Sequence, residues 1–274
     1  ALVVRATWRV AAFQDGRRDL VRTHMLHVLV VSVGGAVHAG HATTALKAPI
    51  GAHLRVGKHH RAYSRDGVVL IPNFLPGDVF TSIVQDTRRL RSQLKPEKGS
   101  MAVGRLGRVL DSRSDVHQCL TSTTVSERLN RYIGSPEKPF IASEYPIELR
   151  VYREGSGMEW HVDDLLYDQP QCEMVLVLEN SSDSSTEFID AAGVLHSEWT
   201  PPNSALLVRA GGAQHRVQPL RRGERTILKM VWQPDGAARR EDRFHTHLDS
   251  MPGLRAKQRP QTSKSKRPAR SRRK

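Results

Sequence analysis

The second half of the chain contains four short runs in which apolar residues alternate with polar ones. They cover residues 147–152, 173–180, 204–210 and 225–232, and clusters of Gly, Pro, Asn and Ser separate them. A period of two is typical of strands with one buried face. Several such strands at this spacing favour a β-sandwich or barrel.

Helical periods occur before residue 145. A buried strand over 68–71 is followed by a predicted helix with Asp78 at its cap. Its apolar positions are Phe80, Ile83, Val84, Thr87, Leu90 and Leu94. A second helix is predicted over 124–133, because Thr124 and Glu127 have the spacing of a capping box.

The basic residues gather at the ends of the chain. Residues 255–274 carry a net charge of +10 and residues 1–65 carry +8, so the stretch between them carries −4 of the total of +14. We therefore expect a mildly acidic folded domain over 66–235, after a targeting or linker segment over 1–65 and before a disordered basic tail over 236–274. An acidic core disfavours nucleic acid as a partner of the domain. The basic tail could be a nuclear address, a polyanion-binding arm or a solubilising extension, and we expect the last.

No apolar run reaches the roughly 18–20 residues needed to span a bilayer. Residues 26–37 have the length of a signal-peptide core, and small residues near Ala39 and Ala42 suit cleavage. A signal or organelle-targeting segment around 25–42 is one interpretation, and a buried strand is the other. Cys119 and Cys172 are too few for a disulfide framework, and two reduced thiols are expected.

The most specific polar pattern is "EWHVDD" at 159–164. On a strand, His161 and Asp163 point to the same face, so both side chains could reach one ion. His215 follows 52 residues after Asp163 and could complete two histidines and a carboxylate, a set that suits non-haem Fe(II). Spacing alone equally allows two solvent-facing polar residues. His247 and Asp249 repeat the spacing, but no histidine follows them.

Arg225 begins a predicted strand ten residues after His215. A guanidinium held rigidly inside a barrel is a suitable partner for a carboxylate-bearing co-substrate. Lys229 should share its face, either as a second contact or, as we expect, with its ammonium group reaching the rim. Trp160 and Trp232 are expected to be packing residues.

With these residues in place, the chain resembles the 2-oxoglutarate- and Fe(II)-dependent dioxygenases, most closely the prolyl 4-hydroxylase-like branch. The resemblance covers about 66–235 and is strongest over 145–232. It is carried by the segments "RVYREGSGMEWHVDD", "TEF" at 186–188, "PPNSALLVRAGG" and "QHRVQPLRRGERTILKMVW". Ser184 and Ser185 depart from the pattern, because the family has a glycine pair there.

The resemblance implies a mainly β fold, a double-stranded β-helix (jelly roll) core with N-terminal supporting helices. It further implies Fe(II) on His161, Asp163 and His215, with 2-oxoglutarate contacted by Arg225 and Tyr152. Tyr152 could instead be a core tyrosine whose hydroxyl a neighbour satisfies.

The implied activity is hydroxylation of a C–H bond with O2, giving succinate and CO2 as co-products, with ascorbate in support. No side chain beyond the metal ligands is expected to be catalytic. The substrate is a protein side chain, prolyl among the options, or a small molecule, and residues 95–120 and 164–172 are candidate substrate loops.

Two other functions fit parts of the pattern. A non-catalytic jelly-roll protein could bind metal or act as a scaffold. A nucleic-acid dealkylating dioxygenase would have a second arginine six residues after Arg225, where this chain has Val231. Neither the oligomeric state nor the compartment follows from the sequence.

Overall fold

The computed structural model of the chain describes residues 50–97, 101–135, 137–249 and 251. The helices are α1 (Ile50–Asp66), α2 (Gly77–Arg88), α3 (Asp115–Leu120), α4 (Thr123–Ile133) and α5 (Glu241–Asp249), with a short 3-10 turn at Arg91–Gln93. The strands are β1 (Val68–Ile71), β2 (Lys95–Pro96), β3 (Ala102–Val103), β4 (Leu106–Val109), β5 (Phe140–Ala142), β6 (Glu148–Tyr152), β7 (Gly157–His161), β8 (Cys172–Asn180), β9 (Thr186–Ile189), β10 (Leu195–Glu198), β11 (Ala205–Arg209), β12 (His215–Val217) and β13 (Arg225–Pro234).

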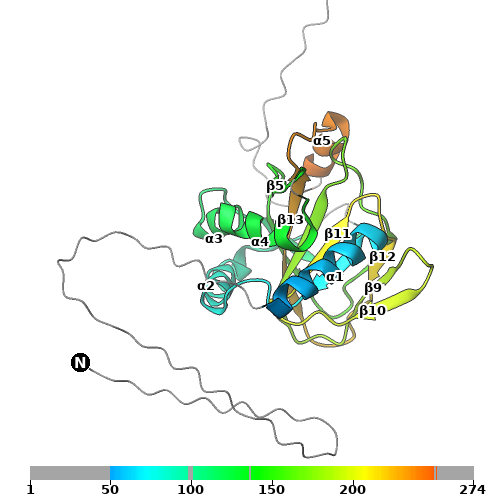
Figure 1. The fold of residues 1–274 in the computed structure, drawn as a ribbon. Helices are drawn as coiled ribbons and strands as arrows, with labels where there is room; N and C mark the ends of the chain where they lie inside the picture. Colours follow the sequence, from blue (N-terminus) through cyan, green and yellow to red (C-terminus); the bar gives the residue numbers. More distant parts are fainter. Residues whose placement is uncertain (1–49, 98–100, 136, 250, 252–274) are drawn as a thin grey trace, which may run out of the picture. The chain divides into compact units, whose positions relative to one another are not determined.

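The strands form two antiparallel sheets. The larger sheet has the order β1-β11-β8-β13-β6-β4-β2, with β5 also pairing with β13, and the smaller has the order β10-β9-β12-β7-β3. Figure 1 shows the two sheets and the helices that accompany them. This is the jelly-roll architecture that the sequence analysis expects, with helices preceding most of the strands.

The central strand β13 separates two environments. Leu228, Met230 and Trp232 pack into the main hydrophobic cluster with residues of α1 to α4. Arg225 and Lys229, on alternate positions, instead line a cavity between the two sheets. Because the side chains of a strand alternate between its two faces, one face of β13 packs against the helices and the other lines the cavity.

The folded region is longer at both ends than the expected span of 66–235. Helix α1 occupies the end of the expected linker, and its Tyr63 is buried in the main cluster. Helix α5 lies in the expected tail, where Phe244 meets Tyr145 edge to face at 5.5 Å. One or two buried apolar side chains are enough to hold a polar helix against the sheet. They are too few to produce a helical pattern of apolar positions in the sequence. Residues 1–49, including the expected targeting segment around 25–42, and 252–274 lie outside the described residues.

Both predicted helix starts need correction. The cap of α4 is Ser122 rather than Thr124, because the Ser122 hydroxyl accepts a hydrogen bond from the Val125 amide. Asp78 lies inside the first turn of α2, which begins at Gly77 without a side-chain cap. Leu90 and Leu94 lie beyond the end of α2, around the 3-10 turn.

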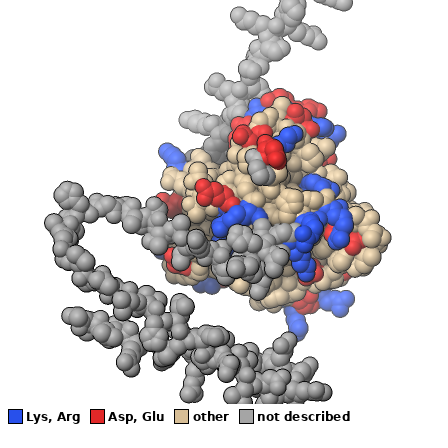
Figure 2. Space-filling view, viewed as in Figure 1, with Lys and Arg blue, Asp and Glu red and all other residues tan. Residues whose placement is uncertain are grey.

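On the face shown in Figure 2, acidic and basic side chains are interspersed. This distribution suits a domain of small net charge. Among the described residues, no helix is both long enough and apolar enough to cross a membrane.

Candidate metal centre

The pairing of β7 with β12 brings two histidines together. His161 and His215 are direct partners in the antiparallel register, and their ring centroids are 4.1 Å apart. Residues opposite each other on paired strands have neighbouring side chains. The sheet register therefore joins two residues that are far apart in the sequence.

Asp163 completes the cluster from the segment that follows β7. Its main-chain carbonyl accepts a hydrogen bond from the Gly211 amide at 2.9 Å, which fixes the backbone at this point. Its carboxylate oxygens lie 3.8 Å from Nε2 of His161 and 3.6 Å from Nε2 of His215. These distances are too long for hydrogen bonds. One ligand atom from each of the three residues lies within 4.8 Å of the others, a spacing that could hold one metal ion.

The other nitrogen of each imidazole is engaged by the backbone. Nδ1 of His161 lies 2.8 Å from the Glu159 carbonyl oxygen, and Nδ1 of His215 lies 3.0 Å from that of Ala213. A carbonyl oxygen can only accept, so each Nδ1 carries a proton and each Nε2 keeps a lone pair for a ligand. Burial, and then the neighbouring His215, lowers the pKa of His161, which favours the neutral form that metal binding requires.

Arg225 lies in the same cavity and has an unused donor. Its side chain is buried, and its Nη1 donates to the Thr186 hydroxyl at 3.0 Å. Its Nε has no hydrogen-bond partner among the residues that the structure describes. Among the described residues, no carboxylate forms an ion pair with it. Burial lowers the pKa of Arg225, which reflects the cost of leaving this charge uncompensated. A carboxylate-bearing ligand would supply the missing partner.

No family model and no curated protein matches the chain, but solved structures do. A prolyl-4-hydroxylase from Pseudomonas putida aligns with a TM-score of 0.52 and 19% identity, covering 68% of this chain and 99% of its own. A Trichoplax adhaerens prolyl hydroxylase, solved with a hypoxia-inducible-factor peptide, aligns with a TM-score of 0.54 and 13% identity. This alignment covers 73% of this chain and 95% of the hydroxylase. The epimerase SnoN, solved with Fe3+, alpha-ketoglutarate and nogalamycin RO, aligns with a TM-score of 0.58 and 15% identity. This alignment covers 74% of this chain and 92% of SnoN.

The fold is that of the 2-oxoglutarate- and Fe(II)-dependent oxygenases. The matches cover almost the whole length of these oxygenases.

Tyr152 lies close to Arg225 in the structure. It is the direct register partner of Arg225 on the neighbouring strand β6, and it lines the same cavity. Its hydroxyl oxygen accepts a hydrogen bond from Nη1 of Arg105 at 2.6 Å. A neighbour therefore satisfies the Tyr152 hydroxyl, as the core-tyrosine alternative expects, while a contact with 2-oxoglutarate stays a prediction.

Lys229 differs from the expectation. Its ammonium group does not reach the rim but forms an ion pair with Glu173 at 2.6 Å, inside the cavity. Burial opposes the charge of Lys229, but the nearby Glu173 outweighs it, and the pKa of Lys229 is raised. A buried acid partner therefore replaces solvent as the stabiliser of this ammonium group.

The cavity contains further charged residues that sequence reasoning missed. Its lining includes Arg105, Arg150 and Glu173. Glu97 and Glu148 are not part of this lining, but they form ion pairs with Arg105 and Arg150, respectively. Glu148 and Arg150 could have been found, because they alternate with apolar residues on the strand that carries Tyr152. Arg105 and Glu97 lie in a hairpin without a clear pattern.

The remaining expectations concern packing residues and the second histidine–aspartate pair. Trp232 is fully buried and Trp160 is half-buried, with the Arg216 guanidinium 4.9 Å from the Trp160 ring centroid. Both cysteines are free. His247 and Asp249 lie on α5, but their side chains are outside the described residues.

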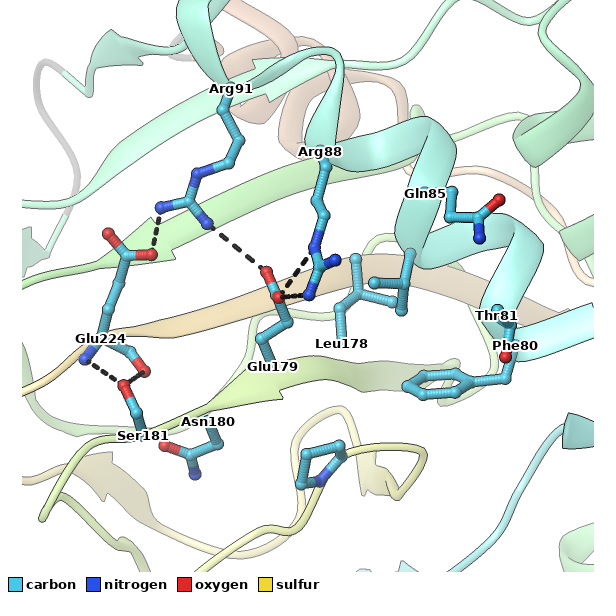
Figure 3. Close-up of a pocket in the computed structure, with 12 residues that line it drawn as sticks. Phe80, Thr81, Gln85, Arg88, Arg91, Leu178, Glu179, Asn180, Ser181 and Glu224 are labelled. Carbon is cyan, nitrogen blue, oxygen red and sulfur yellow. Dashed lines mark hydrogen bonds and ion pairs between the residues drawn. The ribbon is translucent and has the colours of Figure 1, made fainter.

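A second, more open cavity lies outside the barrel between α2 and β8 (Figure 3). Arg88 pairs with Glu179 there, and Arg91 pairs with Glu224 and Glu179 (Figure 3). These charges compensate one another. Among the described residues, no group of three His, Cys, Asp or Glu side chains that could hold a metal ion lies in this cavity.

Proposed function

We propose that this protein is an Fe(II)- and 2-oxoglutarate-dependent dioxygenase that hydroxylates a C–H bond. The observation that carries the proposal is a single cavity that contains both His161, Asp163 and His215 and the unpaired donor of Arg225. The first set suits a metal ion and the second suits a carboxylate.

The donor set fits iron. Two neutral imidazoles and one carboxylate are the ligands of non-haem Fe(II) oxygenases, and they leave the remaining coordination positions open. His161 and His215 would bind through Nε2 and Asp163 through one carboxylate oxygen. The backbone bonds to both Nδ1 atoms and to the Asp163 carbonyl hold the three side chains in place before metal arrives.

The second part of the cavity fits 2-oxoglutarate. Arg225 would bind the carboxylate remote from the metal, with Thr186 holding the guanidinium in place and Tyr152 beside it. When bound, iron and 2-oxoglutarate together activate O2 for hydroxylation, with succinate and CO2 as co-products. Ascorbate would support this by keeping the iron reduced. The structurally similar SnoN contains Fe3+ and alpha-ketoglutarate in its solved complex, which supports the assignment.

For the substrate we propose a protein side chain, with prolyl residues tested first, or a small molecule. The similar Trichoplax protein is in complex with a peptide, and SnoN is in complex with nogalamycin RO. Substrate recognition would involve residues 95–120 and 164–172. The first of these segments contributes Arg105 to the cavity wall.

The test is 2-oxoglutarate turnover by the full-length protein. We expect the wild type to form succinate when air is admitted to protein, Fe(II) and 2-oxoglutarate, first without and then with prolyl peptides. His161→Ala should form none. The matched control is His196→Ala, because His196 pairs with Asp190 away from the cavity. Iron binding without any succinate would instead favour the non-catalytic metal-binding protein.

A further inference from the structure

Arg105 is buried against Tyr152. Its Nη1 lies 2.6 Å from the Tyr152 hydroxyl oxygen, and its guanidinium carbon lies 5.2 Å from the centroid of the Tyr152 ring. The side chains of both residues line the cavity that holds the metal-binding cluster. This contact joins a hairpin residue, which no sequence pattern singles out, to a residue of the proposed co-substrate site.

The charge of Arg105 is already compensated. Its Nε and Nη2 both donate to one carboxylate oxygen of Glu97, at 2.9 and 2.5 Å, and both side chains are nearly inaccessible to solvent. Glu97 also lies 3.5 Å from Arg150. Arg105 therefore has its counter-ion within the protein, whereas Arg225 has none among the described residues. Of the two guanidiniums, Arg225 is the one suited to bind an external anion.

The contact with Arg105 determines whether the Tyr152 hydroxyl donates or accepts each of its hydrogen bonds. A guanidinium has five N–H donors and no acceptor, so the Tyr152 oxygen must accept from Arg105. The hydroxyl proton then has to point in another direction. Tyr152 stands directly opposite Arg225 in the sheet register. The Nε of Arg225 is a second donor, and within the described part of the chain it has no hydrogen-bond partner. Two donors on adjacent strands suit the two oxygens of a carboxylate.

We propose that Arg105 is a positioning residue that commits the Tyr152 hydroxyl to donate to the carboxylate bound by Arg225. Arg105 does not touch the co-substrate and acts through Tyr152. The inference rests on the proposed function, because the ligand is the remote carboxylate of 2-oxoglutarate.

The test is direct calorimetric measurement of 2-oxoglutarate binding to the full-length protein with Fe(II), without oxygen. Arg105→Lys is the informative variant. It keeps the charge beside Glu97, but one ammonium group cannot reproduce the fork that reaches both Glu97 and Tyr152. Arg108→Lys, from the adjoining strand β4, is the matched control. Thermal unfolding of each variant verifies that it folds.

We expect Arg105→Lys to raise the dissociation constant for 2-oxoglutarate about five- to tenfold, which corresponds to the loss of one well-oriented hydrogen bond. Tyr152→Phe should raise it by about tenfold or more. In the double variant, Arg105→Lys should add nothing to Tyr152→Phe, because Arg105 acts through that hydroxyl. Arg108→Lys should bind as the wild type does.

The two proposals fail in different ways. If the wild type takes up no 2-oxoglutarate, the proposed function fails and this inference fails with it. If the wild type binds and Arg225→Ala does not, but Arg105→Lys matches the wild type, the role of Arg105 alone is overturned. Independent, additive effects of Arg105→Lys and Tyr152→Phe would also overturn it, since they would show a general structural role.

Discussion

His161 and His215 stand directly opposite each other on two antiparallel strands, with their ring centroids 4.1 Å apart. The candidate metal centre is therefore a product of sheet register. A slip of one residue between β7 and β12 would turn one of the two imidazoles to the other face of the sheet. The backbone bonds to each Nδ1 then set the direction of each ring.

Metal affinity gives the first prediction. Replacing His215 by alanine removes one of three ligand atoms, so Fe(II) affinity should fall by more than about 100-fold, beyond what the loss of an outer-shell partner causes. Anaerobic Fe(II) titration would measure this. His196→Ala should bind Fe(II) as the wild type does. Equal Fe(II) affinity of His215→Ala and the wild type would show that the metal lies elsewhere.

The three residues that the sequence proposes as metal ligands lie together in the structure. His161 is the last residue of β7 and Asp163 follows outside the strand, so the expected placement of both residues on one strand is not observed. The pairing of β7 with β12 brings His215 to His161. The charged cavity wall was harder to predict. Lys229 was expected at the rim because a lysine stem usually carries its charge to solvent. Its actual partner, Glu173, lies on β8, and only the pairing of β8 with β13 brings them together.

The Lys229–Glu173 pair gives the second prediction. Lys229→Met leaves a buried carboxylate without a counter-ion, so the free energy of unfolding at neutral pH should fall by about 3–5 kcal/mol. Burial already raises the pKa of Glu173 in the folded wild type, and removing the Lys229 charge, which lowers it, should raise it further. The stability that Lys229→Met loses relative to the wild type should therefore become smaller as the pH falls and the Glu173 carboxyl group takes up a proton. Urea unfolding at several pH values would measure both effects.

Two controls accompany this variant. Lys229→Met combined with Glu173→Gln should recover most of the lost stability, because no buried charge remains. Arg88→Met breaks the ion pair between Arg88 and Glu179 (Figure 3). The Arg88 side chain is 60% exposed, so the free energy of unfolding should fall by at most about 1 kcal/mol. If Lys229→Met were as stable as Arg88→Met, this would contradict the conclusion that the Lys229–Glu173 ion pair is buried away from solvent.

The two cysteines give the third prediction. Burial raises the pKa of Cys172 to about 12, and it also raises the pKa of the half-buried Cys119. Since the thiolate is the reactive form, an alkylating reagent at pH 8 should modify Cys119 first and Cys172 only as the protein unfolds. Mass spectrometry of labelled protein in increasing urea would measure this. Rapid labelling of Cys172 in the native protein would contradict its burial.

Cys172 also contributes to the pH dependence of stability. Its folded-state pKa lies above the value of about 8.5 of an unfolded chain, so the unfolded state loses this proton first as the pH rises. The wild type should lose stability between about pH 8.5 and 12 more steeply than Cys172→Ala. Parallel curves for the two proteins would contradict the raised pKa.

The start of α4 gives the fourth prediction. Ser122→Ala removes the hydroxyl that accepts from the Val125 amide, and it should cost about 1 kcal/mol of stability. Thr124→Ala, which tests the cap expected from the sequence, should change stability by much less. Thermal unfolding of both variants would decide between the two positions. The larger loss at Thr124 would restore the sequence-based assignment.

The capping box at Thr124 shows why helix ends were predicted less well than strands. Ser122, Thr123 and Thr124 all have side chains able to cap, and only the path of the preceding chain selects one of them. Helices α1 and α5 were missed because their few apolar anchors, Tyr63 and Phe244 among them, become meaningful only against the sheet that buries them. Tertiary context, which has no local period, decides such cases.

The measurement that tests the central claim most directly is the visible absorbance of the protein as Fe(II) and then 2-oxoglutarate are added without oxygen. We predict a charge-transfer band for the wild type that requires both additions. The band should be absent from Asp163→Ala, and Arg225→Ala should need far more 2-oxoglutarate to develop it. A wild-type protein that develops no such band with both additions present would contradict the assignment of this cavity to iron and 2-oxoglutarate.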